Sequence, residues 1–379
     1  MVRRDFWLTK IEEAWKHRNI AWLSGVRRAG KTFLSQSLDN ISYFDCERPS
    51  TRRMLEDPET FLDDQRGKRI VLDEIHRLPD PSELLKIASD HYPSVKVLAT
   101  GSSSLGASAR FRDTLTGRKR DIWLSPMIAV DMEYFGNTSL RHRLLRGGLP
   151  PFFMTKSHPD KEYQEWLDNF WAKDTLELFR LERRFSFLRF AELLFIQSGG
   201  MFEATRFAAP CEVSRSTISN YLSVLEATYV VHVLRPFSTR RASEIVSAPK
   251  VYGFDSGFVC YYKGWGELRD SDLGLLWEHF VLNELQAQLQ VRTFSYWRDK
   301  SGHEVDLILP GRSGTPTAIE CKWASTNFNP ANIISFRSRY PKGKSYLVAR
   351  DVQRPYSRSY RDVKVEFVDL SRLVEELCT

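Results

Sequence analysis

The chain lacks the cysteine patterns that bind zinc or build a disulfide framework. Its 379 residues contain five cysteines and eight histidines, but no Cys-x-x-Cys pair and no histidine at ligand spacing from a cysteine. The cysteines are scattered at Cys46, Cys211, Cys260, Cys321 and Cys378. We therefore expect reduced thiols and no structural zinc.

Long apolar runs are also missing. No stretch approaches the roughly 20 apolar residues that a membrane-spanning helix requires, and the first residues lack the apolar core of a signal peptide. No internal repeat or low-complexity tract is visible. We expect a cytoplasmic protein with no membrane partner.

The composition is typical of a globular protein with an excess of positive charge. Hydrophobic residues make up 42% of it, enough for two or three domains with their own cores. The net charge of +7 favours an anionic partner such as nucleic acid, because Lys and Arg release phosphate counterions on binding. The same charge also serves solubility, so it supports a DNA partner without requiring one.

A phosphate-binding loop is the most specific motif. Residues 25–32 read Gly-Val-Arg-Arg-Ala-Gly-Lys-Thr and fill every fixed position of Gly-x-x-x-x-Gly-Lys-[Ser/Thr], between a short apolar strand and a helix. The glycines let backbone N–H groups face the β-phosphate, Lys31 reaches the β- and γ-phosphates, and Thr32 offers a hydroxyl to Mg²⁺. The alternative is a chance match in a glycine-containing turn. The predicted nucleotide-binding set at the loop is Gly25, Arg28, Gly30, Lys31, Thr32 and Phe33.

A second motif supports the loop. Residues 68–74 form an apolar run that ends in Asp73 and Glu74, which is typical of a buried parallel strand with carboxylates at its C-terminal edge. Asp73 can bind Mg²⁺, and Glu74 can polarise the attacking water as a catalytic residue. For Asp73 alone, the alternative is a helix N-cap.

A third strand, residues 95–100, brings hydroxyls to the same edge of the predicted sheet. Thr100 or Ser102 can sense the γ-phosphate or position the water, although both residue types are also common in ordinary turns. Basic residues follow, and among them we select Arg118 as the arginine that stabilises the transition state, in cis or from a neighbouring subunit. A solvated basic face explains these residues as well.

These motifs resemble a prokaryotic family of AAA-like P-loop ATPases of the additional-strand class. The resemblance rests on Gly-x-Arg-Arg-x-Gly-Lys-Thr, Leu-Asp-Glu-Ile, Thr-Gly-Ser-Ser-Ser and the later Gly-Gly-Leu-Pro at residues 147–150, and it extends from about residue 20 to about residue 350. It implies a C-terminal part with a winged helix and a nuclease-like domain.

The middle of the chain changes to helical periodicity. Residues 136–189 place aromatic side chains at spacings that favour one helix face, which predicts a helical lid with an aromatic core. Residues 190–245 then show helical apolar spacing, a helix that Ser214 can cap, and a β-branched run. This pattern looks like a winged helix-turn-helix in which Arg215, Ser216 and Asn220 face a DNA groove. The alternative is a small helical domain used for protein contacts.

Two C-terminal strands carry a set of charged residues. Residues 304–309 include Asp306, and residues 318–322 place Glu320 and Lys322 on one strand face. The two carboxylates can converge on Mg²⁺, with Lys322 orienting water or stabilising the charged phosphorane. This resembles the Asp…Glu-x-Lys core of the restriction-endonuclease-like superfamily, and the resemblance adds Glu278, on a preceding helix, as a supporting metal ligand. A surface salt bridge is the alternative for Glu320 and Lys322.

We therefore expect an α/β chain of four parts. These are a P-loop ATPase domain with a parallel sheet (1–135), a helical lid (136–189), a winged helix-turn-helix (190–245) and a small restriction-endonuclease-like domain (246–379). The predicted function is a Mg²⁺-dependent ATPase that binds and remodels or translocates DNA, working with ATP as a homo-oligomer, for which a ring is one form. Two alternatives stay open: a nucleotide switch whose C-terminal domains bind a protein, and a structure-specific nuclease regulated by ATP.

Overall fold

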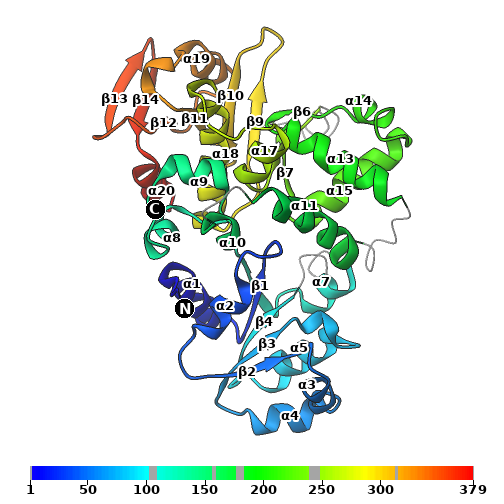
Figure 1. Ribbon diagram of the computed structural model, residues 1–379. Helices are drawn as coiled ribbons and strands as arrows, with labels where there is room; N and C mark the ends of the chain where they lie inside the picture. The colour runs from blue at the N-terminus through cyan, green and yellow to red at the C-terminus, as the bar shows by residue number, and fades with distance from the viewer. Residues whose placement is uncertain are drawn as a thin grey trace. The chain divides into compact units, whose positions relative to one another are not determined.

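The computed structural model describes residues 2–101, 109–155, 159–175, 183–238, 248–311 and 315–378. The chain forms two compact units, each assembled from separate stretches of sequence. The first unit contains residues 1–139, 148–188 and 220–230, and the second contains residues 140–147, 189–219 and 231–379. Figure 1 labels their helices and strands.

The first unit is built on a five-stranded parallel sheet in the order β2-β3-β4-β1-β5. Its strands are short and mostly buried, as expected for a parallel sheet covered on both faces. Because all five run in the same direction, their carboxyl ends meet at one edge. The strands are β1 (Ile20–Ser24), β2 (Ile41–Asp45), β3 (Arg69–Asp73), β4 (Lys96–Thr100) and β5 (Lys119–Trp123).

Helices cover both faces of this sheet. Alternate strand residues such as Ile20, Ile70 and Val97 form one core with α4, α5 and α7, while α1 packs on β1 and β5, and α2 packs on β3 and β4. Asp57 and Asp80 accept backbone hydrogen bonds that cap α4 and α5, and a proline opens each of these helices. The helices are α1 (Asp5–His17), α2 (Lys31–Gln36), α3 (Pro49–Met54), α4 (Pro58–Asp64), η1 (Ile75–Arg77), α5 (Pro81–His91), α7 (Ala109–Leu115) and α8 (Ala129–Tyr134).

A helical segment completes the first unit. It comprises α10 (Pro150–Phe153), α11 (Asp160–Asn169) and a π-helical turn (Phe170–Thr175). Tyr163, Trp166 and Phe170 are buried, and the rings of Trp166 and Phe170 stack with their centroids 5.6 Å apart. The aromatic side chains thus form a core, as the spacing predicted. Two longer helices, α13 (Arg184–Ile196) and α15 (Arg215–Ala227), have residues in both units.

The second unit is built on a nine-stranded mixed sheet in the order β13-β14-β12-β11-β10-β9-β7-β8-β6. β10 pairs antiparallel with β9 and β11, whereas β12 runs parallel to β11 and β14. The strands are β6 (Gly200–Met201), β7 (Val231–Pro236), β8 (Lys250–Gly253), β9 (Ser295–Arg298), β10 (Glu304–Leu309), β11 (Thr317–Lys322), β12 (Ser345–Ala349), β13 (Tyr356–Tyr360) and β14 (Val363–Val368).

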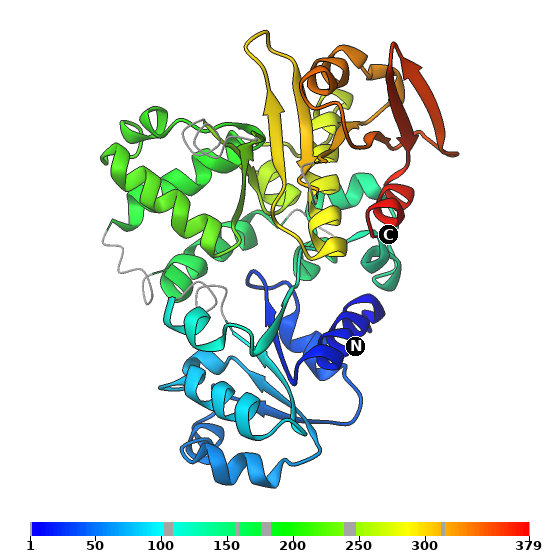
Figure 2. The same cartoon turned by 180° about the vertical axis from the view of Figure 1, so that it is seen from behind.

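Helices pack on both faces of the C-terminal part of this sheet. The long helix α18, yellow in Figure 2, packs on β11, and Trp277 Nε1 donates to the carbonyl of Val348 at 3.2 Å. α20 packs beside α18, while Ile333 and Phe336 of α19 enter a separate core. The helices of this unit are α9 (Leu140–Arg146), α14 (Ala204–Ala208), α17 (Ser256–Tyr262), α18 (Asp270–Leu289), η4 (Ser325–Asn327), α19 (Pro330–Arg339) and α20 (Leu370–Cys378).

The predicted parallel sheet is confirmed, and the strands expected within residues 68–74 and 95–100 are β3 and β4. The α/β class and the parallel sheet follow from short apolar runs separated by helical segments. The division into four parts stays a prediction. Among the described residues, no helix combines the length and apolar character that crossing a bilayer demands.

Candidate functional site

The phosphate-binding loop runs from the end of β1 into α2. A Cβ on Gly25 would come within 2.5 Å of the carbonyl oxygen of Leu124, and Gly30 has a φ of 97°, so both positions require glycine. Lys31 Nζ donates to the carbonyl of Gly25 at 2.9 Å and to that of Val26 at 3.3 Å. The ammonium is therefore directed into the turn of the loop, where the motif places a phosphate.

Asp73 joins three elements at the carboxyl edge of the sheet. The Thr32 hydroxyl donates to Asp73 Oδ2 at 2.9 Å, and the Tyr43 hydroxyl donates to the same oxygen at 2.5 Å. The Thr100 hydroxyl donates to Asp73 Oδ1. Burial and the Asp73 carboxylate together raise the pKa of the Tyr43 hydroxyl, so Tyr43 remains a donor. Thr32 and Asp73 are hard oxygen ligands in contact, which is the donor set that Mg²⁺ prefers.

Glu74 is held ionised beside this site. Its backbone takes a left-handed conformation, with φ 53°, and its N–H donates to the Thr100 hydroxyl at 3.1 Å. Burial by itself would raise the pKa of Glu74, but the hydrogen bond from His76 and the charges of Lys31 and Arg27 lower it below its usual value. His76 Nδ1 lies 3.1 Å from Glu74 Oε2. An ionised carboxylate at this position can accept a proton from water.

Two residues far away in the sequence brace the loop. Arg4, which is 4% exposed and precedes α1, donates to the carbonyl of Ala29 at 3.0 Å. The same guanidinium forms a two-pronged pair with the fully buried Asp131, at 2.8 and 2.5 Å. On the other side, Trp166 Nε1 donates to the carbonyl of Arg27 at 2.9 Å. The backbone of the loop is therefore held by side chains from α11 and from the residues before α1, and Asp131 of α8 positions Arg4.

A cavity of about 570 Å³ opens over the loop. Its lining includes Arg28 and Phe33 of the predicted nucleotide set, together with Glu74 and Pro150. Phe33 is 65% exposed, so its ring is available to a ligand. The structure brings the predicted loop residues, Asp73, Glu74 and Thr100 together around this cavity and the adjoining sheet edge. Ser102 lies outside the described residues.

Arg118 lies away from this site. It precedes β5, whose residue Lys119 pairs with Ile20 at the start of β1, whereas the phosphate-binding loop follows the end of β1. Arg118 Nε donates to Asp90 Oδ1 at 2.8 Å. Arg118 lies at the amino ends of the parallel strands, whereas the nucleotide loop lies at their carboxyl ends. The length of a strand therefore separates them, which excludes a role of Arg118 at its own subunit's nucleotide. A role at a neighbouring subunit stays a prediction.

The polar face predicted on residues 215–220 is exposed. Ser214 Oγ accepts from the N–H of Thr217 at 3.2 Å, which is the predicted N-cap of α15. Arg215, Ser216 and Asn220 are exposed, while Ile218 is buried. The helix therefore has the two faces that its sequence pattern indicated.

In the second unit, α18, β10 and β11 bring four buried or partly buried acids together. We call Glu278, Glu304, Asp306 and Glu320 the acidic cluster. Lys322 Nζ lies 3.0 Å from Asp306 Oδ2 and 2.8 Å from Glu320 Oε2, and Asp306 Oδ2 also accepts from the N–H of Cys321 at 2.8 Å. Glu320 is fully inaccessible and Lys322 is partly buried, so the surface salt bridge considered for this pair is wrong.

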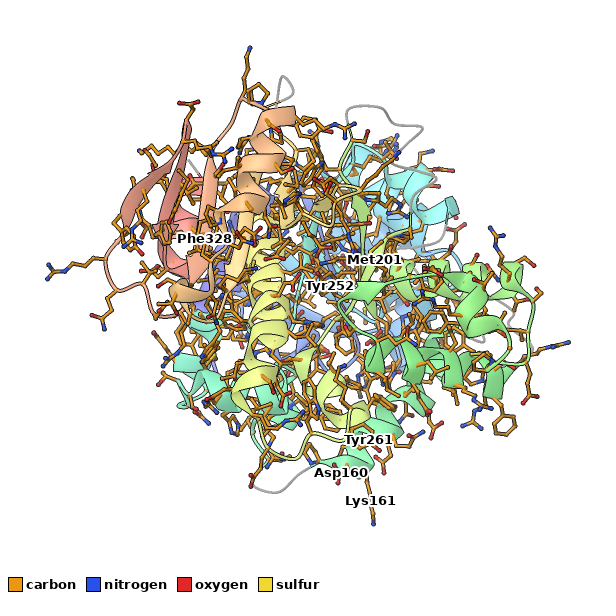
Figure 3. The ribbon with its side chains drawn as sticks, turned by 90° about the horizontal axis from the view of Figure 1, so that it is seen from above. Asp160, Lys161, Met201, Tyr252, Tyr261 and Phe328 are labelled. Carbon is orange, nitrogen blue, oxygen red and sulfur yellow. The ribbon has the colours of Figure 1, made fainter. Side chains whose placement is uncertain are left out.

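A second lysine, which the sequence did not single out, completes this arrangement. Lys250 Nζ lies 3.7 Å from Glu278 Oε1 and forms an ion pair with Glu304. Tyr252, labelled in Figure 3, donates its hydroxyl to Glu278. Both residues come from β8, which lies outside the Asp…Glu-x-Lys pattern, so no spacing signal pointed to them.

The carboxyl groups of the acidic cluster differ in protonation. Burial and the neighbouring Asp306 charge raise the pKa of Glu278 to about 7. Burial and Asp306 also raise the pKa of Glu320 well above its ordinary value. Burial alone would raise the pKa of Asp306, but the charges of Lys322 and Lys250 hold it below the ordinary value. Asp306 is therefore the ionised centre of the cluster.

Comparison with known proteins identifies the N-terminal part. Residues 17–132 match a family described as an AAA domain, and residues 137–269 and 273–370 match two families described as domains of unknown function. The uncharacterized proteins Rv2008c of Mycobacterium tuberculosis and Mb2031c of Mycobacterium bovis are each 30% identical to the chain over 336 residues. The matches cover 86% of the chain and 74% of each relative.

Solved structures also match the chain. The Walker-type ATPase paby2304 of Pyrococcus abyssi is 14% identical, with a TM-score of 0.45, and the match covers 69% of the chain and 96% of that protein. AMPPCP-bound DnaA from Aquifex aeolicus is 11% identical, with a TM-score of 0.30, over 59% of the chain and 87% of that protein.

Proposed function

Because the chain belongs to the family of Rv2008c and Mb2031c and carries a P-loop domain of the AAA type, we propose that it is a Mg²⁺-dependent ATPase that acts on DNA. The single observation that supports hydrolysis best is the joint arrangement of Thr32, Asp73 and Glu74 beside the loop. Two oxygen ligands in contact adjoin an ionised carboxylate that can activate water.

Each residue has a separate task in this mechanism. Lys31 and the loop amides bind the phosphates, and Thr32 and Asp73 would hold Mg²⁺, which neutralises charge on the phosphate oxygens. Glu74 accepts the proton of the attacking water, while His76 keeps its carboxylate ionised and oriented. Thr100 links Asp73 to the backbone of Glu74, so the metal ligand and the base keep their relative position.

Replacing Glu74 by Gln tests this assignment. We expect ATP binding to persist while turnover falls about 100-fold or more, because the amide cannot accept the proton. Glu47→Gln is the matched control, because Glu47 lines the same cavity. The turnover of this variant should stay near that of the unchanged chain. Unchanged turnover in Glu74→Gln would reject the role of Glu74 as the base.

The DNA-binding part of the proposal rests on α13, β6, α14, α15 and β7 of the predicted winged helix, and on β8, which follows its predicted end at residue 245. Their order along the chain, with β8 antiparallel to both β6 and β7, is that of a winged helix, and α15 exposes Arg215, Ser216 and Asn220. The net charge of +7 supports an anionic partner. In the C-terminal part, helix α18 is followed by the antiparallel hairpin β10–β11 and then by helix α19. This order supports a restriction-endonuclease-like fold there.

DNA binding can be measured by fluorescence anisotropy at several salt concentrations. We expect the logarithm of the binding constant to fall with the logarithm of salt by about 0.9 per neutralised phosphate. Arg215→Ala should weaken binding and reduce this slope by about one phosphate contact, whereas Arg53→Ala, exposed on α3, should not. Binding that is absent or independent of salt would contradict the proposal.

ATPase rates with and without DNA then separate this proposal from a nucleotide switch that recognises a protein. Stimulation by branched, duplex or single-stranded DNA is the expected result. Hydrolysis that is indifferent to every DNA form would favour the switch instead. The mass of the nucleotide-bound particle, measured on the same protein preparation, tests the predicted homo-oligomer.

A divalent metal does not fit the acidic cluster as its residues now stand. Each of the four acids is already engaged by Lys250 or Lys322, and the described residues contain no group of three metal-ligating side chains arranged around a common point. We therefore assign no cleavage step to Asp306, Glu320 or Glu278. The role proposed for this domain is to bind DNA.

A further inference from the structure

Lys250 contacts two acids of the acidic cluster, Glu278 and Glu304. It is the first residue of β8 and is only 6% exposed, with its ammonium 3.7 Å from Glu278 Oε1 and paired with Glu304. The charge of Asp306 also acts on it. A single ammonium group therefore interacts with Glu278 of α18 and with the acids of β10.

This ammonium remains charged despite its burial. It keeps its charge because it forms an ion pair with Glu304 and lies 3.7 Å from Glu278 Oε1. A charged lysine beside Glu278 and Glu304 supplies the positive charge that a bound cation would otherwise bring. Lys322 does the same for Asp306 and Glu320 on the other side of the cluster.

A divalent cation would have to displace this lysine. Mg²⁺ and similar ions need several oxygens that converge at about 2.0–2.1 Å, and they lose affinity steeply beside a fixed positive charge. The side chain of Lys250 cannot simply turn into solvent, because it is enclosed and its strand pairs with β6 on one side and β7 on the other. Its ammonium also lies 5.7 Å from the centre of the Tyr296 ring.

We infer that Lys250 is a built-in counter-ion that keeps divalent metal out of the acidic cluster, so that the C-terminal domain binds DNA without cutting it. The inference rests on the proposed nuclease-like fold. It places the counter-charge of the acidic cluster on β8, a strand that pairs with both β6 and β7.

Titration of the nucleotide-free full chain with Mn²⁺, followed by calorimetry and by the Mn²⁺ paramagnetic resonance signal, tests the inference. The proteins to compare are the unchanged chain, Asp306→Asn, Lys250→Met, and Lys250→Met combined with Asp306→Asn. Binding at Asp73 and at other acids is common to all four, so the effect of Asp306 isolates the acidic cluster. Lys250→Arg, which retains the charge, is the conservative control.

We expect the unchanged chain and Asp306→Asn to bind Mn²⁺ alike. Lys250→Met should gain at least about tenfold in Mn²⁺ affinity, and Asp306→Asn should abolish that gain, while Lys250→Arg should behave as the unchanged chain. A folded Lys250→Met variant without this gain would overturn the inference. So would Mn²⁺ binding by the unchanged chain that Asp306→Asn removes, a comparison that remains decisive even where Lys250→Met fails to fold.

The metal titration requires neither DNA nor ATP. Failure of the chain to bind DNA would therefore reject the proposed function and leave the assignment of Lys250 standing. Conversely, an Asp306-dependent metal site in the unchanged chain would reject the counter-ion and leave DNA binding untouched.

Discussion

The pairing of Arg4 with Asp131 couples the stability of the first unit to the shape of the phosphate-binding loop. Asp131 is fully buried and accepts four hydrogen bonds, two from Arg4, one from Trp7 Nε1 and one from the N–H of Ile128. Arg4 Nη1 also donates to the carbonyl of Ala29 in the loop. Asp131→Asn keeps the shape of the side chain but removes its charge and replaces one acceptor oxygen by an NH₂ donor.

The expected loss of stability is large because both groups are buried. Breaking a buried ion pair by removing one partner costs about 3–5 kcal/mol, since the other charge is left uncompensated. Replacing both partners together, as in Arg4→Met with Asp131→Leu, should recover part of this loss, because no buried charge remains, although Trp7 Nε1 and the N–H of Ile128 lose their acceptor. The double variant nevertheless lacks the charged donor to Ala29. A hydrogen bond of this kind is worth about 1.5–3 kcal/mol, so nucleotide binding should weaken about 10- to 100-fold.

Two measurements on the same proteins separate the roles of the pair. Urea unfolding gives the free energy of unfolding, and equilibrium titration with a fluorescent ADP gives nucleotide affinity. Asp39→Asn is the matched control, because Asp39 pairs with Arg3 on the exposed surface and should change neither quantity. A stable double variant that binds ADP as tightly as the unchanged chain would refute the claim that Arg4 positions the loop.

Two further predictions concern Thr100 and His232. Thr100→Val should cost about 1–3 kcal/mol of stability and lower turnover, because the buried carboxylate of Asp73 and the N–H of Glu74 both lose a partner, while Thr100→Ser should restore both. A Val variant with full turnover would contradict the linking role. His232 is buried, and burial lowers its pKa well below 6.5, so the unfolded chain takes up the proton first as the pH falls. The stability that neutral, buried His232 contributes is complete above pH 6.5. Below that pH the free energy of unfolding falls by about 1.4 kcal/mol per pH unit. Urea unfolding between pH 7 and 5 should therefore show a shallower loss for His232→Phe, and an equal slope in that variant and in the exposed control His17→Gln would refute this.

Much of the nucleotide site is visible in the sequence because its residues follow short-range rules. The loop requires glycines at fixed spacing before Lys31 and Thr32, and Asp73 and Glu74 follow an apolar strand whose end must meet the same sheet edge. The strands themselves follow from apolar runs. Thr100 was found by the same rule, and its bond to the backbone of Glu74 adds a contact that the spacing did not contain.

The residues that sequence reasoning missed are those that reach the site from elsewhere. Arg4 and Asp131 are 127 positions apart, and nothing in their local pattern distinguishes them from an exposed arginine and a helix-capping acid. Tyr43 and His76 lie on ordinary-looking elements until folding directs their polar atoms at Asp73 and Glu74. Arg118 shows the reverse case, because a local motif suggested a role that the direction of β5 excludes within one subunit.

By itself, the sequence determined which chemistry is present: a phosphate cradle, oxygen ligands for a metal, a candidate base and a second group of acids with a lysine. These depend on spacing along one or two neighbouring elements, which local geometry governs. Only the tertiary structure decided what surrounds each group. It brings Arg4 to the loop and Lys250 to the acids, and it turns Arg118 away, because such contacts arise from strand order and helix packing between distant segments. In the low-dielectric interior these neighbours set the charge state of each acid, and with it what each site can bind.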